Sequence, residues 1–222
     1  MIVRKRIFEK AAPSRDAQKI YIFCEGERRE KEYFDFFVGI SSNLQIIPIP
    51  PENSQSDPLK LLEQARRLFL VQDHPLDLDI HERDLVWFAI DTDSWGEEGK
   101  IKYLRLFCEE QNTNLCYSAW NVAESNPCIE IWLYYHIYED KPDRDEVGQY
   151  QSMKEFIDNK IRGGFDCSTM PAYIKTAIKN AEKNYSADDN GPTLFSTEEY
   201  LLGKDIWKYA GPEIERKTNR LL

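Results

Sequence analysis

Long hydrophobic runs are missing from this chain of 222 residues, and its longest apolar stretches fall well short of the roughly 20 residues that a membrane-spanning helix needs. The first residues, Met-Ile-Val-Arg-Lys-Arg, also lack the apolar core of a signal peptide. The sequence therefore predicts a cytoplasmic protein with no membrane partner.

Paired cysteine motifs and histidine clusters are absent too. The five cysteines are widely spaced and form no Cys-x-x-Cys pair, and the chain has only three histidines. These counts argue against a zinc site. The sequence also contains no Gly-x-x-x-x-Gly-Lys-Ser/Thr loop, so we expect any ATP-driven step to belong to another protein.

The charge of the chain is acidic overall but unevenly distributed. The formal net charge of −10 argues against a protein that simply coats nucleic acid, which would normally be basic. Residues 1–20 nevertheless hold six basic and two acidic side chains, a local charge of +4, and a second basic region lies near the C-terminus. Basic ends fit a metal-dependent enzyme that approaches a polyanion, and they equally fit ordinary solvated charge.

Strand-like and helix-like segments alternate along a chain whose 41% hydrophobic content is typical of a folded protein. The pattern predicts strands at 20–24, 44–49, 84–90 and 114–120, and helices at 30–38, 57–72, 100–111 and 128–138. This order predicts an α/β fold with a parallel sheet flanked by helices and a helical C-terminal part. The predicted organisation is a basic segment at 1–19, a core at 20–150, and a helical extension at 151–222, broken at 163–164, 187–192 and 211–212, that packs on the core.

Two acidic clusters each follow one of the predicted buried strands. A Glu-Gly-Glu triplet occupies 25–27, and Asp-Thr-Asp occupies 91–93. In open α/β sheets, sites lie just past the carboxyl ends of the strands. Since alternate residues of an extended segment project the same way, Asp91 and Asp93 are expected to face one ion while Thr92 points elsewhere. Carboxylate oxygens suit Mg²⁺, so the pattern predicts a metal site that works on phosphate.

Three ordered motifs carry a resemblance to a known family. They are Cys-Glu-Gly-Glu-Arg-Arg-Glu-Lys-Glu-Tyr-Phe at 24–34, Val-Trp-Phe-Ala-Ile-Asp-Thr-Asp at 86–93, and Glu-Ser-Asn-Pro-Cys-Ile-Glu-Ile-Trp-Leu-Tyr-Tyr-His at 124–136. Together they resemble the signatures of RloB-like proteins, which are tied to restriction-modification and phage-abortive-infection loci. Arg29 stands where that family more often has Thr. The resemblance spans roughly residues 20–195.

The resemblance implies a Toprim-like (topoisomerase–primase) core and a nuclease that acts on DNA or RNA in antiphage defence, with an ATPase partner from the same locus. It implies that Glu25, Asp91 and Asp93 hold Mg²⁺ or Mn²⁺. Glu25 would be a ligand or a general acid/base, and Glu130, a carboxylate in an otherwise apolar helix, is a second catalytic candidate. Candidate substrate contacts are Asn126, His136 and Arg28. No cofactor site other than the metal is expected.

The residues alone leave other functions open. The chain fits a metal-dependent phosphohydrolase or nucleotidyl-transfer enzyme with a small substrate, although Glu25 precedes the Asp-x-Asp pair, the opposite of the order expected for an aspartyl-nucleophile phosphatase. It also fits a non-catalytic regulatory subunit. Simpler roles exist for single residues: Glu27 as a charge at a helix start, Asn126 as a helix cap, and His136 as a structural histidine.

Overall fold

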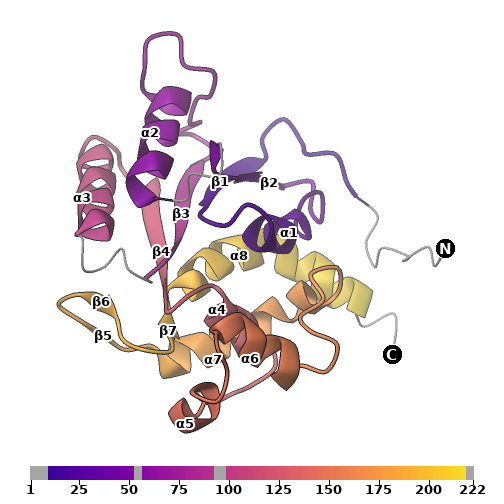
Figure 1. Ribbon diagram of the computed structural model, residues 1–222. Coiled ribbons are helices and arrows are strands. Elements are labelled where there is room, and N and C mark those ends of the chain that lie inside the picture. Colours follow the sequence, from indigo (N-terminus) through magenta and orange to yellow (C-terminus); the bar gives the residue numbers. More distant parts are fainter. Residues whose placement is uncertain (1–9, 53–56, 93–98, 219–222) are drawn as a thin grey trace.

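The computed structural model describes residues 10–52, 57–92 and 99–218. Within this part, a five-stranded sheet has the strand order β2-β1-β3-β4-β7 (Figure 1). The parallel strands are β1 (Gln18–Cys24), β2 (Leu44–Ile49), β3 (Leu85–Asp91) and β4 (Trp120–Asn126), and β7 (Ser196–Thr197) pairs antiparallel to β4. This mostly parallel sheet confirms the predicted α/β class and is consistent with a Toprim-like arrangement.

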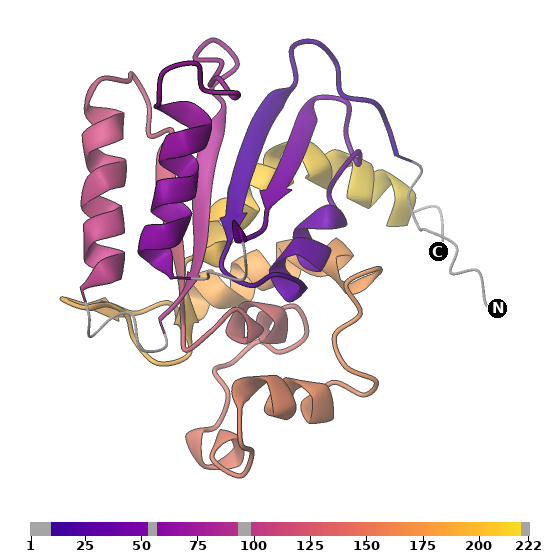
Figure 2. The ribbon, with the colours of Figure 1, turned by 45° about the horizontal axis from the view of Figure 1, so that its top comes forward.

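Helices cover both faces of the sheet, as the two views show (Figures 1 and 2). α2 (Pro58–Phe69) and α3 (Lys100–Thr113) stand side by side and pack on one face. The other face packs against a larger set: α1 (Arg29–Asp35), α4 (Glu130–Tyr135), α6 (Met153–Lys160), α7 (Ile174–Asn184) and α8 (Glu199–Thr218). Because β1 and β3 are buried on both faces, their sequences are almost continuously apolar.

The connections between these elements are short or irregular. α5 (Arg144–Val147) and a 3₁₀ helix (Met170–Tyr173) lie in the C-terminal half, and β5 (Ala187–Asp188) and β6 (Gly191–Pro192) form a small hairpin.

Within the described residues, no helix is both long enough and apolar enough to cross a membrane.

Two local features of these elements have a clear chemical cause. The Asp57 side chain caps α2 by accepting a hydrogen bond from the Leu59 amide at 2.8 Å, and Pro58 occupies the first helical position. β2, which contains Pro48, lies at the edge of the sheet, where a missing backbone donor is tolerated.

The predicted strand at 114–120 is wrong, because β4 begins where that prediction ends. Asn112, near the end of α3, fixes the start of the strand: its side chain accepts a hydrogen bond from the Trp120 amide and donates one to the Trp120 carbonyl. β4 contains the polar residues Glu124 and Ser125, both 1% exposed, so its sequence lacks the apolar pattern of a buried strand.

The helix predicted at 128–138 is also shorter in the structure, where α4 covers only Glu130–Tyr135. Asn126 does not cap it, since Asn126 is the last residue of β4 and the residue before α4 is Ile129. The break predicted at 211–212 does not occur either. α8 continues through exposed Pro212 because Ile206, Ala210 and Ile214 hold its inner face in the core.

The C-terminal part of the chain is more than a helical cover. β7 comes from this part and extends the central sheet beside β4, an element that the sequence pattern did not predict. Elements from residues 151–218 therefore share the sheet and its core with the N-terminal elements.

Candidate functional site

Glu25 and Asp91, two of the predicted metal ligands, lie together at the carboxyl ends of neighbouring strands. β1 pairs with β3, and Glu25 follows β1 directly while Asp91 is the last residue of β3. The Asp91 amide donates a hydrogen bond to Oε2 of Glu25 at 2.8 Å. Oδ1 of Asp91 accepts a hydrogen bond from the Ile129 amide at 2.7 Å, which joins the end of β3 to the approach to α4. The two carboxylates therefore belong to one small region.

Asp93, the third predicted ligand, lies outside the described residues. Among the residues that are described, no group of three or more Asp, Glu, His or Cys side chains is placed to hold a metal ion. Glu25 and Asp91 offer the hard oxygen donors that Mg²⁺ prefers, so the donor chemistry fits, with two of the three predicted carboxylates described. Thr92 turns away from them, as predicted, and its hydroxyl donates to Oε1 of Glu124 at 2.9 Å.

Glu30 is a buried carboxylate beside this region that the sequence prediction did not single out. It is 4% exposed, and its Oε1 accepts a hydrogen bond from the Gly26 amide at 2.9 Å. A Cβ atom on Gly26 would lie 1.9 Å from Oε2 of Glu30, so only glycine leaves room for this contact. Burial raises the pKa of the Glu30 carboxyl, the Gly26 amide opposes that rise, and the charge of Glu130 adds to it.

Glu130, the second catalytic candidate, is the first residue of α4 and pairs with Arg29, the first residue of α1. Its Oε1 lies 3.6 Å from Nη1 of Arg29, and Nη2 of Arg29 lies 3.4 Å from Oδ1 of Asp158. Burial raises the pKa of the Cys128 thiol far above its ordinary value, and the charges of Glu130 and Asp91 raise it further. The charges of Glu130 and Asp91 thus both act on Cys128, which follows β4 and precedes α4.

Glu199, at the start of α8, is the most deeply buried acid near this region. It is 1% exposed, and neither side-chain oxygen has a hydrogen-bond partner among the described residues. Burial raises the pKa of its carboxyl well above the ordinary value, and the nearby charges of Glu30 and Glu198 add to the shift. The burial and the missing partners both favour the neutral form of this carboxyl, because an unpaired buried charge is costly.

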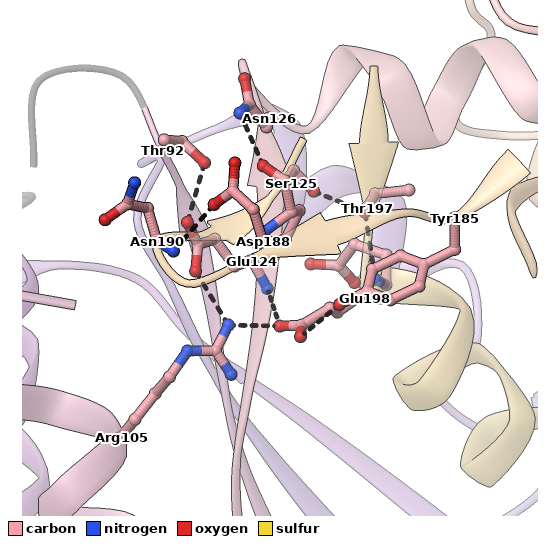
Figure 3. A network of polar contacts seen from close by, with 12 residues as sticks. Thr92, Arg105, Glu124, Ser125, Asn126, Tyr185, Asp188, Asn190, Thr197 and Glu198 are labelled. Carbon is pink, nitrogen blue, oxygen red and sulfur yellow. Dashed lines mark hydrogen bonds and ion pairs between the residues drawn. The ribbon is translucent and has the colours of Figure 1, made fainter. Parts of the chain in front are cut away.

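A polar network on the other side of the β4 end surrounds Glu124 (Figure 3). Nη2 of Arg105, from α3, lies 2.8 Å from Oε2 of Glu124 and 2.5 Å from Oε2 of Glu198. The Glu124 amide donates to Oε2 of Glu198, and the Tyr185 hydroxyl donates to Oε1 of Glu198. Burial raises the pKa of Glu124, although Arg105 and Thr92 oppose that rise. One arginine thus pairs with two carboxylates, and Thr92 connects Glu124 to the segment that carries Asp91.

The β5–β6 hairpin closes over this network (Figure 3). Gly191 has φ +116°, and a Cβ atom there would lie 3.0 Å from Oε2 of Glu124. The Asn126 side chain donates to the Pro192 carbonyl at 2.7 Å, and the Ser125 and Thr197 hydroxyls are 2.7 Å apart. The hairpin and β7 therefore fix the end of β4 through side chains far away in the sequence.

The three predicted substrate contacts occupy different surroundings. Asn126 is bonded to the hairpin, as described above. His136 is 2% exposed, with its ring nitrogens near the Tyr33 hydroxyl and the Trp132 carbonyl, and burial lowers its pKa to about 3. This burial favours a structural role for His136. Arg28 is exposed and pairs with Glu32 at 2.8 Å, on the rim of a cleft of about 700 Å³.

The sequence analysis did not identify several of these residues, and the reason is clear for each of them. Glu30 carried a usable signal, because it lies three and four positions before buried Tyr33 and Phe34 and so shares their helix face. Glu124 and Glu199 carried none, because the groups around them come from α3 and from the chain after residue 180.

The fold and this edge of the sheet define a class of α/β protein in which buried acidic side chains gather where parallel strands end. A family model described as RloB-like protein matches residues 20–204, and the chain belongs to the RloB-like family. Comparison with curated proteins and with solved structures gives no significant match.

Proposed function

We propose that this protein is a Mg²⁺-dependent nuclease that cleaves phosphodiesters in antiphage defence. The observation that carries the proposal is the 2.8 Å hydrogen bond from the Asp91 amide to Oε2 of Glu25, which holds the Glu25 carboxylate against the backbone of Asp91 at the carboxyl edge of a parallel sheet. Ligand sites in open α/β sheets lie at this edge. Membership of the RloB-like family supports the same function through the resemblance of its motifs.

The side chains suggest separate tasks. Glu25 and Asp91, with Asp93, would hold Mg²⁺ or Mn²⁺, which when bound supplies charge stabilisation at the phosphate. The Ile129 and Asp91 amides orient the two described carboxylates by donating to them. Glu130, held near Arg29, is the candidate for holding or moving a proton at the leaving or attacking oxygen.

The proposed partners are nucleic acid, DNA or RNA, and an ATPase from the same defence locus. The sequence contains no phosphate-binding loop of the P-loop type, so the proposal assigns ATP hydrolysis to that separate protein. Arg28, which is exposed beside the start of α1, and Asn126 remain proposed contacts to the substrate.

The test is cleavage by the purified protein with Mg²⁺ or Mn²⁺, with and without EDTA. Asp91→Asn keeps an oxygen that can accept the Ile129 amide but removes the charge, so we expect cleavage to fall at least about a hundredfold while the melting temperature changes little. Asp145→Asn, an exposed acid on α5, is the matched control. A calorimetric Mn²⁺ titration should show binding by the wild type and the control but not by Asp91→Asn.

Other outcomes would select other functions. Hydrolysis of a small phosphate ester without cleavage of any nucleic acid would indicate the phosphohydrolase. Undiminished phage protection by Asp91→Asn and Glu25→Gln would indicate a regulatory subunit without catalysis. Cleavage by Asp91→Asn at the wild-type rate would contradict the metal site itself.

A further inference from the structure

A groove between α7 and α8 gathers basic side chains on a protein whose net charge is −10. The two helices pack side by side (Figure 1). The groove between them has a volume of about 590 Å³. Five lysines and one tryptophan line it: Lys175, Lys179, Lys183, Lys204, Lys208 and Trp207. Glu182 is the acidic residue among the lining residues, and Glu215, Glu139 and Asp140 pair with lysines at the margin of the groove.

The sequence of each helix directs its lysines toward the groove. On α7, Lys175, Lys179 and Lys183 recur every four residues, so they form one row about 12 Å long at the 1.5 Å rise of a helix. On α8, Lys204 and Lys208 have the same spacing. The inward side of each helix is apolar, with Ile178 and Ala181 on α7 and Leu202 and Ile206 on α8 buried in the core.

These lysines are available to a ligand. Three of them form exposed ion pairs, Lys175 with Glu215, Lys183 with Glu139 and Asp140, and Lys204 with Glu182. Exposed pairs of this kind contribute little stability, so a phosphate can replace the carboxylate. Within the described part of the chain, Lys179 and Lys208 form no ion pair with a carboxylate.

Trp207 gives the groove an aromatic surface among the cations. Nζ of Lys175 lies 5.5 Å from the centre of its ring. Gly211 leaves space for the ring, since a Cβ atom there would lie 2.6 Å from Cε2 of Trp207. A charged groove interleaved with an aromatic ring is how proteins bind single-stranded nucleic acid, with phosphates on the lysines and a base stacked on the ring.

We propose that the α7–α8 groove binds the backbone of single-stranded DNA or RNA, and this choice of occupant rests on the proposed nuclease function. The same helix reaches both places: α8 begins at buried Glu199, whose carboxyl is affected by the charge of Glu30, and exposed Lys204 follows five residues later on another face of the helix.

The test is fluorescence anisotropy with labelled single-stranded DNA and RNA 20-mers in EDTA, so that binding is measured without cleavage. Replacing Lys179 and Lys208 together by glutamine should raise Kd about tenfold, and the slope of log K against log salt should fall by about 0.7 for each lysine. Trp207→Leu should weaken binding about fivefold. The control replaces Lys60 and Lys102, exposed lysines on α2 and α3, and should bind as wild type.

Several results would overturn the groove. The wild type would fail to bind single strands, or the groove and control variants would bind them equally well. Displacement of the labelled strand by polyglutamate as strongly as by unlabelled single strands would also contradict the proposal. The nuclease proposal fails on a different result: if the groove variants lose binding as expected but the wild type never cleaves with Mg²⁺ or Mn²⁺, the groove stands and the nuclease function does not.

Discussion

Replacing Arg105 by methionine tests whether one cation holds together the two carboxylates at the end of β4. Methionine keeps most of the apolar stem of arginine and removes its charge. The substitution leaves Glu124 and Glu198, whose side chains are 1% and 13% exposed, next to each other without the cation that pairs with both. Removing one member of a buried ion pair costs about 3–5 kcal/mol. Because the Arg105 side chain itself is 32% exposed, water weakens the effect, and we expect a loss of about 3 kcal/mol.

Urea unfolding followed by circular dichroism at pH 7 measures this loss. The double variant Arg105→Met/Glu124→Gln should recover part of it, because glutamine removes one charge and still accepts the Thr92 hydroxyl. The loss of unfolding free energy caused by Arg105→Met should also become smaller as pH falls. Burial already raises the pKa of Glu124, and protonation removes the unpaired charge of its carboxylate. Arg28→Met, which breaks an exposed pair, is the control and should not move the midpoint measurably. A loss no larger than the control, or no recovery in the double variant, would refute the role given to Arg105.

Three further predictions concern nearby positions. Gly191→Ala should destabilise the fold by about 1–3 kcal/mol in urea unfolding, because φ is +116° there and the new Cβ would lie 3.0 Å from Glu124; an unchanged midpoint would contradict this. The pKa of Glu199 is raised in the fold, so its contribution to stability is complete below about pH 4.5 and declines as pH rises. Glu199→Gln should therefore lose less stability than the wild type between pH 5 and pH 8. Parallel curves of unfolding free energy against pH for the two proteins would refute this prediction. Gly26→Ala should displace the Glu30 carboxylate, since the new Cβ atom would lie 1.9 Å from Oε2 of Glu30. We expect this variant to lose cleavage while calorimetric titration still detects Mn²⁺ binding. Full cleavage activity would show that the contact between Gly26 and Glu30 is dispensable.

The part of the candidate site that the sequence predicted depends on local pattern and simple topology. Glu25 and Asp91 each follow an apolar strand, and adjacent parallel strands bring their carboxyl ends together, so their proximity needed no knowledge of side-chain packing. The same reasoning gave the α/β class and the start of α2 at Asp57.

The part that the sequence did not predict depends on partners far along the chain. β4 was missed because Glu124 and Ser125 are polar, and their burial is possible only because Arg105 and Thr197 bind them. β7 has two residues and no hydrophobic period, so its pairing with β4 leaves no signal in its own sequence. In this protein, prediction of strands from hydropathy thus fails where polar residues are buried by partners far along the chain.

The antiparallel pairing of β7 with β4 has a consequence for synthesis of the chain. Ser125 and Asn126 pair with Thr197 and Ser196, about 70 residues later, so any nascent chain that ends before this point leaves the side of β4 without its neighbour. An unpaired strand edge is prone to join the strands of other chains. Glu124 in the same fragment also lacks Glu198, and Arg105 has only one carboxylate to bind. The acidic edge of the sheet is therefore completed only after the chain as far as Glu198 has been made.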